Sequence, residues 1–274
     1  MLLFKIDPEK TVQMVKNSLS SIDSVIDKLV AVLSQDITTQ GIWTVVQTAV
    51  EVSTSIAIVL VVLFWLVTFL NEILEKEWRS LSLSWYFRKL CVLIFAETII
   101  KCAPDVIIMI YNFVAWAMQQ YNINLGASNL FNSIDFTAFK DSLEGMGFCE
   151  HLWLRVEIYV PSILIRLAGA IIQIIVWFRI LQICMLTIIS PIPFSTFVNE
   201  RHSGVFAFIK ESIAVCGQAI IMILACELYK GMVVQIVGNT VTDVGSIWQL
   251  CVATLVLLIT IMGSQKLAGL FLGR

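Results

Sequence analysis

The order of apolar and polar residues predicts an all-α membrane protein. Three uncharged apolar runs, at 52–71, 180–199 and 244–265, each have about the 20 residues that a helix needs to cross a hydrocarbon layer roughly 30 Å thick. Two further apolar regions carry charges but are long enough to cross as well. We therefore expect a transmembrane helix bundle over 43–265, with about five spans at 43–70, 90–118, 156–193, 213–237 and 244–265.

The first 42 residues form a separate segment that contains an amphipathic helix. Over 9–34, apolar residues recur at intervals of three and four, at Val12, Val15, Leu19, Ile22, Ile26, Leu29 and Leu33. This spacing places them in one stripe along a helix. Two interpretations stay open: a helix that lies on the membrane or on its own protein, and a seam for self-association.

The third apolar region is about twice as long as an ordinary span. Residues 156–198 include Glu157, Arg166 and Arg179, and a charge near the middle of a bilayer costs on the order of 3 kcal/mol or more. Pro191 and Pro193 lack the backbone N–H and disfavour helix in the residues before them, so they are expected to end the helix. We expect one long helix that packs against others, rather than a hairpin of two spans.

The two arginines of this helix are predicted to contact neighbouring helices. Arg166 lies near Gly169 and Ala170, and such small residues let another helix approach closely. Arg179 lies on nearly the opposite side, where we expect it to seek a carboxylate, either Glu227 or Glu97.

Charges in the second span form the best candidate for a polar site. Glu97, Lys101 and Asp105 are four residues apart, so they share one helical face and can pair in series. The functional interpretation is the wall of a hydrated conduit, or a relay for protons or ions. The structural one is a set of salt bridges between packed helices, or an interfacial helix bent at Pro104.

Composition agrees with a membrane protein and argues against an enzyme. The chain is 58% hydrophobic and 14% charged, with a mean hydropathy of +0.88, whereas soluble domains have about 25% charged residues. Common phosphate-loop, metalloprotease, hydrolase and dinucleotide motifs are missing, and no CxxC pair is present. We therefore predict no catalytic, cofactor-binding or metal-ligating residues. A net charge of −2 without a basic run argues against tight nucleic-acid binding.

Lysine and arginine near the span ends predict the orientation. They are concentrated in the connector 71–89, the turn 199–210 and the tail 266–274, whereas acidic residues outnumber them in the segment 119–155. By the positive-inside rule, the N-terminus and an external loop at 119–155 lie outside, and the C-terminal tail lies in the cytoplasm. The first residues show no secretory signal pattern, so we expect the first span to direct insertion.

The C-terminal third resembles a known family. The stretches LTIISPIPFSTFVNE at 186–200, AFIK at 207–210, CGQAI at 216–220 and MGSQKLAGLFLG at 262–273 are similar to the TrbL family of conjugation proteins. These are the polytopic, VirB-six-like channel subunits of type IV secretion systems. Members have a long helix that closes on a Pro-x-Pro step, a short cytoplasmic turn and a following span. The loop 119–155 is shorter than in many of them.

The resemblance implies a function as well as a fold. It implies five spans in the bacterial cytoplasmic membrane with an external N-terminus, in agreement with the charges. It also implies a homo-oligomeric platform that helps a transient DNA or protein substrate across the lipid bilayer, together with other secretion subunits and separate ATPases. The alternatives are a scaffold without a path and a small-solute or ion transporter that uses Glu97, Lys101 and Asp105. Transporters usually show inverted repeats, and this sequence shows none.

Overall fold

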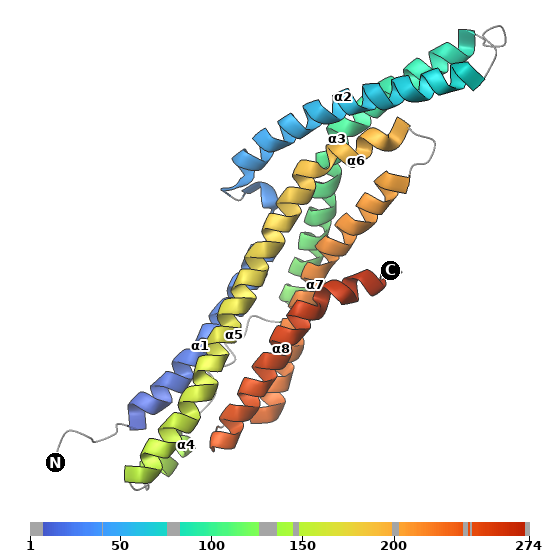
Figure 1. Ribbon diagram of the computed structural model, residues 1–274. Coiled ribbons are helices and arrows are strands. Elements are labelled where there is room, and N and C mark those ends of the chain that lie inside the picture. Colours follow the sequence, from blue (N-terminus) through green and yellow to red (C-terminus); the bar gives the residue numbers. More distant parts are fainter. Residues whose placement is uncertain are drawn as a thin grey trace. The chain divides into compact units, whose positions relative to one another are not determined.

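The computed structural model describes residues 8–39, 41–75, 83–125, 136–144, 148–198, 203–237, 241 and 243–271, and helices are the only regular secondary structure among them. These residues contain eight α-helices and two short 3-10 helices (Figure 1). They are α1 (Pro8–Ser34), η1 (Ile37–Thr39), α2 (Trp43–Glu75), α3 (Leu83–Leu125), α4 (Thr137–Glu144), α5 (Phe148–Ile189), α6 (Pro191–Ser195), η4 (Thr196–Val198), α7 (Ser203–Val237) and α8 (Val244–Phe271).

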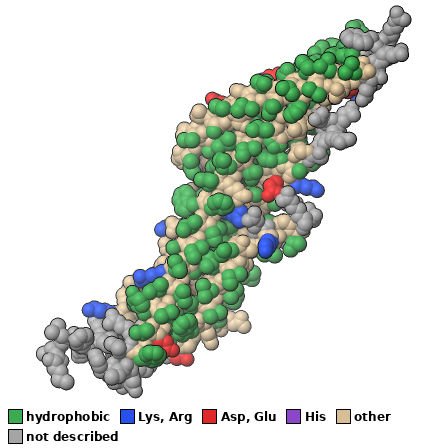
Figure 2. All heavy atoms as spheres, in the orientation of Figure 1, with side chains coloured by type: hydrophobic (Ala, Val, Ile, Leu, Met, Phe, Trp, Pro, Cys, Tyr) green, Lys and Arg blue, Asp and Glu red, His purple; other side chains and the backbone are tan. Residues whose placement is uncertain are grey.

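Four helical stretches are long and apolar enough to cross a membrane. They are Trp43–Leu74, Val156–Val198, Gly204–Ile236 and Val244–Ser264, and they support a multi-pass membrane protein. On the face drawn in Figure 2, hydrophobic side chains cover much of the surface. Helix α3, which holds the predicted second span, is not among the four. Its 43 residues include Arg88, Lys89, Glu97, Lys101 and Asp105.

The third apolar region is one long helix, as predicted. Helix α5 runs without interruption from Phe148 to Ile189 and continues through Pro161. It ends where Pro191 cannot donate an N–H to the carbonyl oxygen of Thr187. The hydroxyl of Ser190 donates to that oxygen instead, at 2.8 Å. The short helix α6 then turns away from the axis of α5 (Figure 1).

Several segments that were predicted as loops are helical. Helix α3 extends to Leu125, α4 occupies 137–144, and α5 begins at Phe148, so the predicted external loop 119–155 is largely helix in its described part. Likewise, α7 begins at Ser203, inside the predicted turn 199–210, and α8 continues to Phe271 in the predicted tail. The predictions followed hydropathy, which marks apolar length rather than helix ends. Residues 126–135, 145–147, 199–202 and 272–274 lie outside the described residues.

The chain divides into two compact units. Unit 1 takes the chain up to Ser34, then Ala117–Phe178 and Gln218–Leu267; unit 2 takes Gln35–Trp116, Arg179–Gly217 and the chain from Ala268 onward. Each unit is therefore built from stretches that are far apart in the sequence. Helices α3, α5, α7 and α8 contribute to both.

In unit 1, helix α1 packs on its own protein. All seven residues of its apolar stripe are at most 9% exposed. A Cβ added to Gly169 of α5 would lie 3.7 and 3.8 Å from side-chain atoms of Val25 and Ile22 in α1. This confirms the prediction that α1 lies against its own chain. The stripe is covered within one chain, so the alternative of a self-association seam is wrong.

In unit 2, α2 and α3 form an antiparallel hairpin that rests on α6. The core between them combines small and larger side chains: Ala57, Val61, Ala96, Ile100, Ala103, Phe194, Val198 and Val205. Three alanines at the α2–α3 contact let the backbones approach closely. Further along the hairpin, the indole N–H of Trp65 donates to the carbonyl oxygen of Lys89 at 3.0 Å, and Lys89 pairs with Glu72. These contacts set the register of the hairpin.

Candidate functional site

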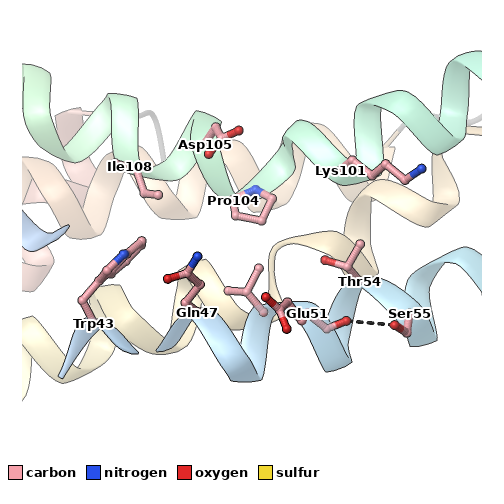
Figure 3. A pocket seen from close by; sticks show the side chains of 10 residues that line it. Trp43, Gln47, Glu51, Thr54, Ser55, Lys101, Pro104, Asp105 and Ile108 are labelled. Atoms are coloured by element: carbon pink, nitrogen blue, oxygen red, sulfur yellow. Dashed lines mark hydrogen bonds between the residues drawn. The ribbon is translucent and has the colours of Figure 1, made fainter. Parts of the chain in front are cut away.

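A polar cavity of about 470 Å³ lies between α2 and α3 in unit 2 (Figure 3). Its polar lining comes from Gln47, Glu51, Thr54 and Ser55 of α2 and from Lys101 and Asp105 of α3; Trp43, Val50, Pro104 and Ile108 complete it. In Figure 3, Trp43 and Gln47 point from α2 toward α3, and Pro104 points back toward α2. Two members of the predicted Glu97–Lys101–Asp105 set therefore line a cavity.

The spacing of polar residues on each helix explains this lining. Gln47, Glu51 and Thr54 follow the pattern i, i+4 and i+7, which gathers them on one side of α2. The hairpin register then selects their neighbours on α3. Trp65 meets Lys89, and Glu51 is fourteen residues before Trp65 while Ala103 is fourteen after Lys89. Glu51 therefore lies at the level of the turn that holds Lys101 and Asp105.

Of the two ion pairs predicted for Glu97, Lys101 and Asp105, the structure contains the one between Glu97 and Lys101. The ammonium nitrogen of Lys101 lies 2.7 Å from a carboxylate oxygen of Glu97, but the two side chains are 57% and 45% exposed. Asp105 is exposed and forms no ion pair within the described part of the chain. In water, an exposed i,i+4 pair contributes only about 0.3–0.5 kcal/mol. The pair is therefore not a buried staple between the helices of this chain.

Arg166 contacts a neighbouring helix, as predicted. Its Nε donates to the hydroxyl oxygen of Ser18 in α1 at 3.0 Å. The close approach expected at Gly169 occurs at the same helix, because Ile22 and Val25 of α1 lie against it. Both contacts belong to unit 1 and hold α1 against α5.

Arg179 has a different partner from the predicted one. It is 5% exposed, and its Nη1 donates to the side-chain oxygen of Gln182 at 2.8 Å. Within the described residues its Nε has no hydrogen-bond partner. The predicted partners Glu227 and Glu97 pair instead with Lys230 at 3.1 Å and with Lys101. Gln182 lies three residues along the same helix, whereas Glu227 and Glu97 belong to α7 and α3, and the prediction overlooked this local contact.

The sequence-based prediction missed the contribution of α2 to the cavity. Gln47, Glu51 and Thr54 were recognisable as a polar half of an otherwise apolar helix. Their proximity to Lys101 and Asp105 follows from the register of the α2–α3 hairpin. That register can be derived only when one contact between the two helices is known. Among the described residues, no group of three or more His, Cys, Asp or Glu side chains could hold a metal ion. The cavity thus offers charge and hydrogen bonds for an ion, a polar solute or water.

No model of a protein family, no curated protein and no solved structure matches this chain.

Proposed function

We propose that this chain is a non-enzymatic channel or platform subunit of a conjugative type IV secretion system. Several copies would surround or support a path for DNA or protein across the bacterial cytoplasmic membrane, powered by separate ATPases. The proposed topology has five spans, an external N-terminus and a cytoplasmic C-terminus. The resemblance of the C-terminal third to the TrbL family supports the class of system, and the exposed charges of α3 support an assembly.

The single observation that carries the assembly is the exposed Glu97–Lys101 pair. If α3 crosses the membrane as the predicted second span, these two charges and Asp105 lie within its apolar stretch. Facing lipid, each would cost on the order of 3 kcal/mol or more. A neighbouring subunit or a water-filled path removes that cost. The charges therefore favour a function in which α3 does not face lipid.

The exposed side chains of α2 also support an arrangement with lipid on one side of the hairpin and a polar neighbour on the other. Its exposed residues include large apolar side chains at regular intervals, such as Val52, Val59, Leu63 and Leu66. These suit lipid, whereas Gln47 and Glu51 suit water. The hairpin of α2 and α3 thus combines an apolar face with a charged one, as expected of a subunit that has lipid on one side and a polar neighbour on the other.

Transfer of the mobile element tests the proposal. Deleting the gene should abolish conjugation, and the wild-type gene supplied on a plasmid should restore it. K101E should lower transfer because it places two carboxylates together, and the exchange E97K/K101E should restore much of it by re-forming the pair. V59L, on the apolar face of α2, is the matched control and should transfer normally. Normal conjugation by the deletion strain would refute the proposal.

A second candidate function is a small-solute or ion transporter. The observation in its favour is the cavity, where Glu51, Lys101 and Asp105 place both signs of charge beside hydroxyl and amide groups. It predicts that purified protein in liposomes catalyses flux of a specific small ion or solute, and that E51Q and D105N reduce that flux. Flux together with dispensability for conjugation would favour the transporter over the secretion subunit.

A further inference from the structure

The cavity between α2 and α3 has one apolar end and one polar end (Figure 3). Trp43 and Ile108 lie at the apolar end, and Ser55 and Lys101 lie at the polar end. Trp43 is eight residues before Glu51 on α2, which is about 12 Å along the helix axis at 1.5 Å per residue. The cavity volume of about 470 Å³ is within the roughly 300–1,000 Å³ typical of small-molecule sites. The cavity therefore suits an elongated ligand with one polar and one apolar part.

The cavity has more carboxylates than cations to balance them. Glu51 and Asp105 lie between its two ends and come from opposite helices (Figure 3). The ammonium nitrogen of Lys101 already lies 2.7 Å from a carboxylate oxygen of Glu97, so these two charges cancel. Within the part of the chain that the structure describes, neither Glu51 nor Asp105 forms an ion pair. Both carboxylates are therefore available to a positively charged ligand.

The rest of the lining favours an organic cation over a metal ion. A hard metal ion takes about six or more oxygen ligands, and among the described residues no group of three or more His, Cys, Asp or Glu side chains could hold one. Trp43, Pro104 and Ile108 offer apolar surface instead, which packs well against an aliphatic or aromatic body. The two carboxylates and the amide oxygen of Gln47 can accept hydrogen bonds from an ammonium group.

Lys101 limits the number of charges that such a ligand can carry. It lies at the end of the cavity opposite Trp43 (Figure 3). A second ammonium group at that end would meet a like charge and be repelled. A single ammonium group between Glu51 and Asp105, with its apolar body toward Trp43, avoids this repulsion. The arrangement therefore favours a monoammonium ion over a linear diamine.

We propose that the cavity between α2 and α3 binds an organic monoammonium ion. Glu51 and Asp105 supply its counter-charges, and Trp43 packs against its apolar body. The inference goes beyond the proposed function, because the cavity binds the ammonium ion whether or not the chain serves conjugation. A free amine and the amino headgroup of a phospholipid share this chemistry, and the lipid composition of the binding assay distinguishes them.

Equilibrium dialysis of phenethylammonium against purified protein in phosphatidylcholine nanodiscs tests the site, with empty nanodiscs as the blank. The neutral 2-phenylethanol has the same apolar body and should bind roughly tenfold more weakly or worse, because it lacks the charge. E51Q and D105N should each weaken phenethylammonium binding roughly tenfold, as expected for the loss of one charge-assisted interaction. E157Q is the matched control, because it removes an exposed acid of α5 outside the cavity and should bind as the wild type does.

Two further arms sharpen the test. K101Q should bind phenethylammonium more tightly than the wild type, because it removes the only cation of the lining and releases the carboxylate of Glu97. A residue with a merely structural role would not produce this gain. In nanodiscs of phosphatidylethanolamine, weaker apparent binding would identify the lipid headgroup as a competing ligand, and unchanged binding would identify a free amine. Both results support an ammonium site.

Two results would overturn the inference. If 2-phenylethanol binds as tightly as phenethylammonium, the protein recognises only the apolar body. If E51Q and D105N bind phenethylammonium as E157Q does, the amine is not held by the carboxylates of the cavity. Dialysis does not depend on transfer of the mobile element. A chain that binds the amine as expected but is dispensable for conjugation would therefore refute the proposed function and leave the ammonium site in place.

Discussion

Truncating Ile22 tests whether α1 is held by packing against α5. Ile22 is fully buried, and its Cγ1 lies 3.8 Å from a Cβ built on Gly169. I22A removes three carbons, worth about 2.4 kcal/mol at roughly 0.8 kcal/mol each. The cavity left behind raises the expected loss to about 3 kcal/mol, within the typical range for such truncations. At roughly 2–4 °C per kcal/mol, the apparent Tm should fall by about 6–12 °C.

The assay is thermal denaturation of detergent-solubilised protein, followed by size-exclusion chromatography. S24A is the matched control, because Ser24 is on the exposed face of the same helix and its substitution should change stability by no more than about 0.5 kcal/mol. Proteolysis should also cut α1 earlier in I22A than in S24A. Equal Tm values for the two variants would refute the packing of the stripe against the chain.

Substitutions at three further positions test local features. G169A should be tolerated, since its Cβ would meet α1 at ordinary contact distances of 3.7 and 3.8 Å, whereas G169L should detach α1 and lower the Tm. Asp243 caps α8 by accepting from the backbone N–H and hydroxyl of Ser246 at 3.1 and 2.6 Å, so D243A should cost about 1 kcal/mol at neutral pH. The same hydrogen bonds lower the pKa of Asp243. The contribution of Asp243 to stability is therefore present above its unfolded-state pKa and is lost as pH falls through the lower folded-state pKa. The Tm difference between wild type and D243A should accordingly shrink in acid. S190A removes the donor to the carbonyl oxygen of Thr187 at the end of α5, which should cost about 1 kcal/mol in the same denaturation assay; an unchanged Tm would show that this junction does not depend on the hydroxyl.

Features that depend on one helix were predictable from the sequence. The stripe of α1, the uninterrupted course of α5 and its end before Pro191 all follow from local periodicity or from the missing proline N–H. Helix ends in polar segments were predicted less well. The segment 137–144 is polar overall, yet it forms α4 with Phe139 buried, because a short amphipathic helix needs few apolar residues.

Features that depend on two helices were not predictable. The cavity required the hairpin register that brings Glu51 level with Lys101. The partner of Arg179 is an exception, because Gln182 lies three residues along the same helix, a spacing at which side chains meet, and the prediction overlooked it. Periodicity shows which residues share a face of one helix, but it does not show which faces of two helices meet. The same limit explains why the α1 stripe left two interpretations open until its burial was known.

Exposure, rather than pairing, distinguishes the charges that hold this chain together from those available to other molecules. Lys230 and Glu227 are 11% and 12% exposed. Removing one of them would leave the other as an unpaired buried charge, at a cost of several kcal/mol. Lys101 and Glu97 are paired just as closely but about half exposed, and the fold of a single chain needs them far less. If α3 crosses the membrane, as proposed, water or a neighbouring subunit would have to meet these two charges, because lipid is too costly a neighbour for them. This argument favours the functional interpretation of α3 over a salt bridge that merely joins packed helices.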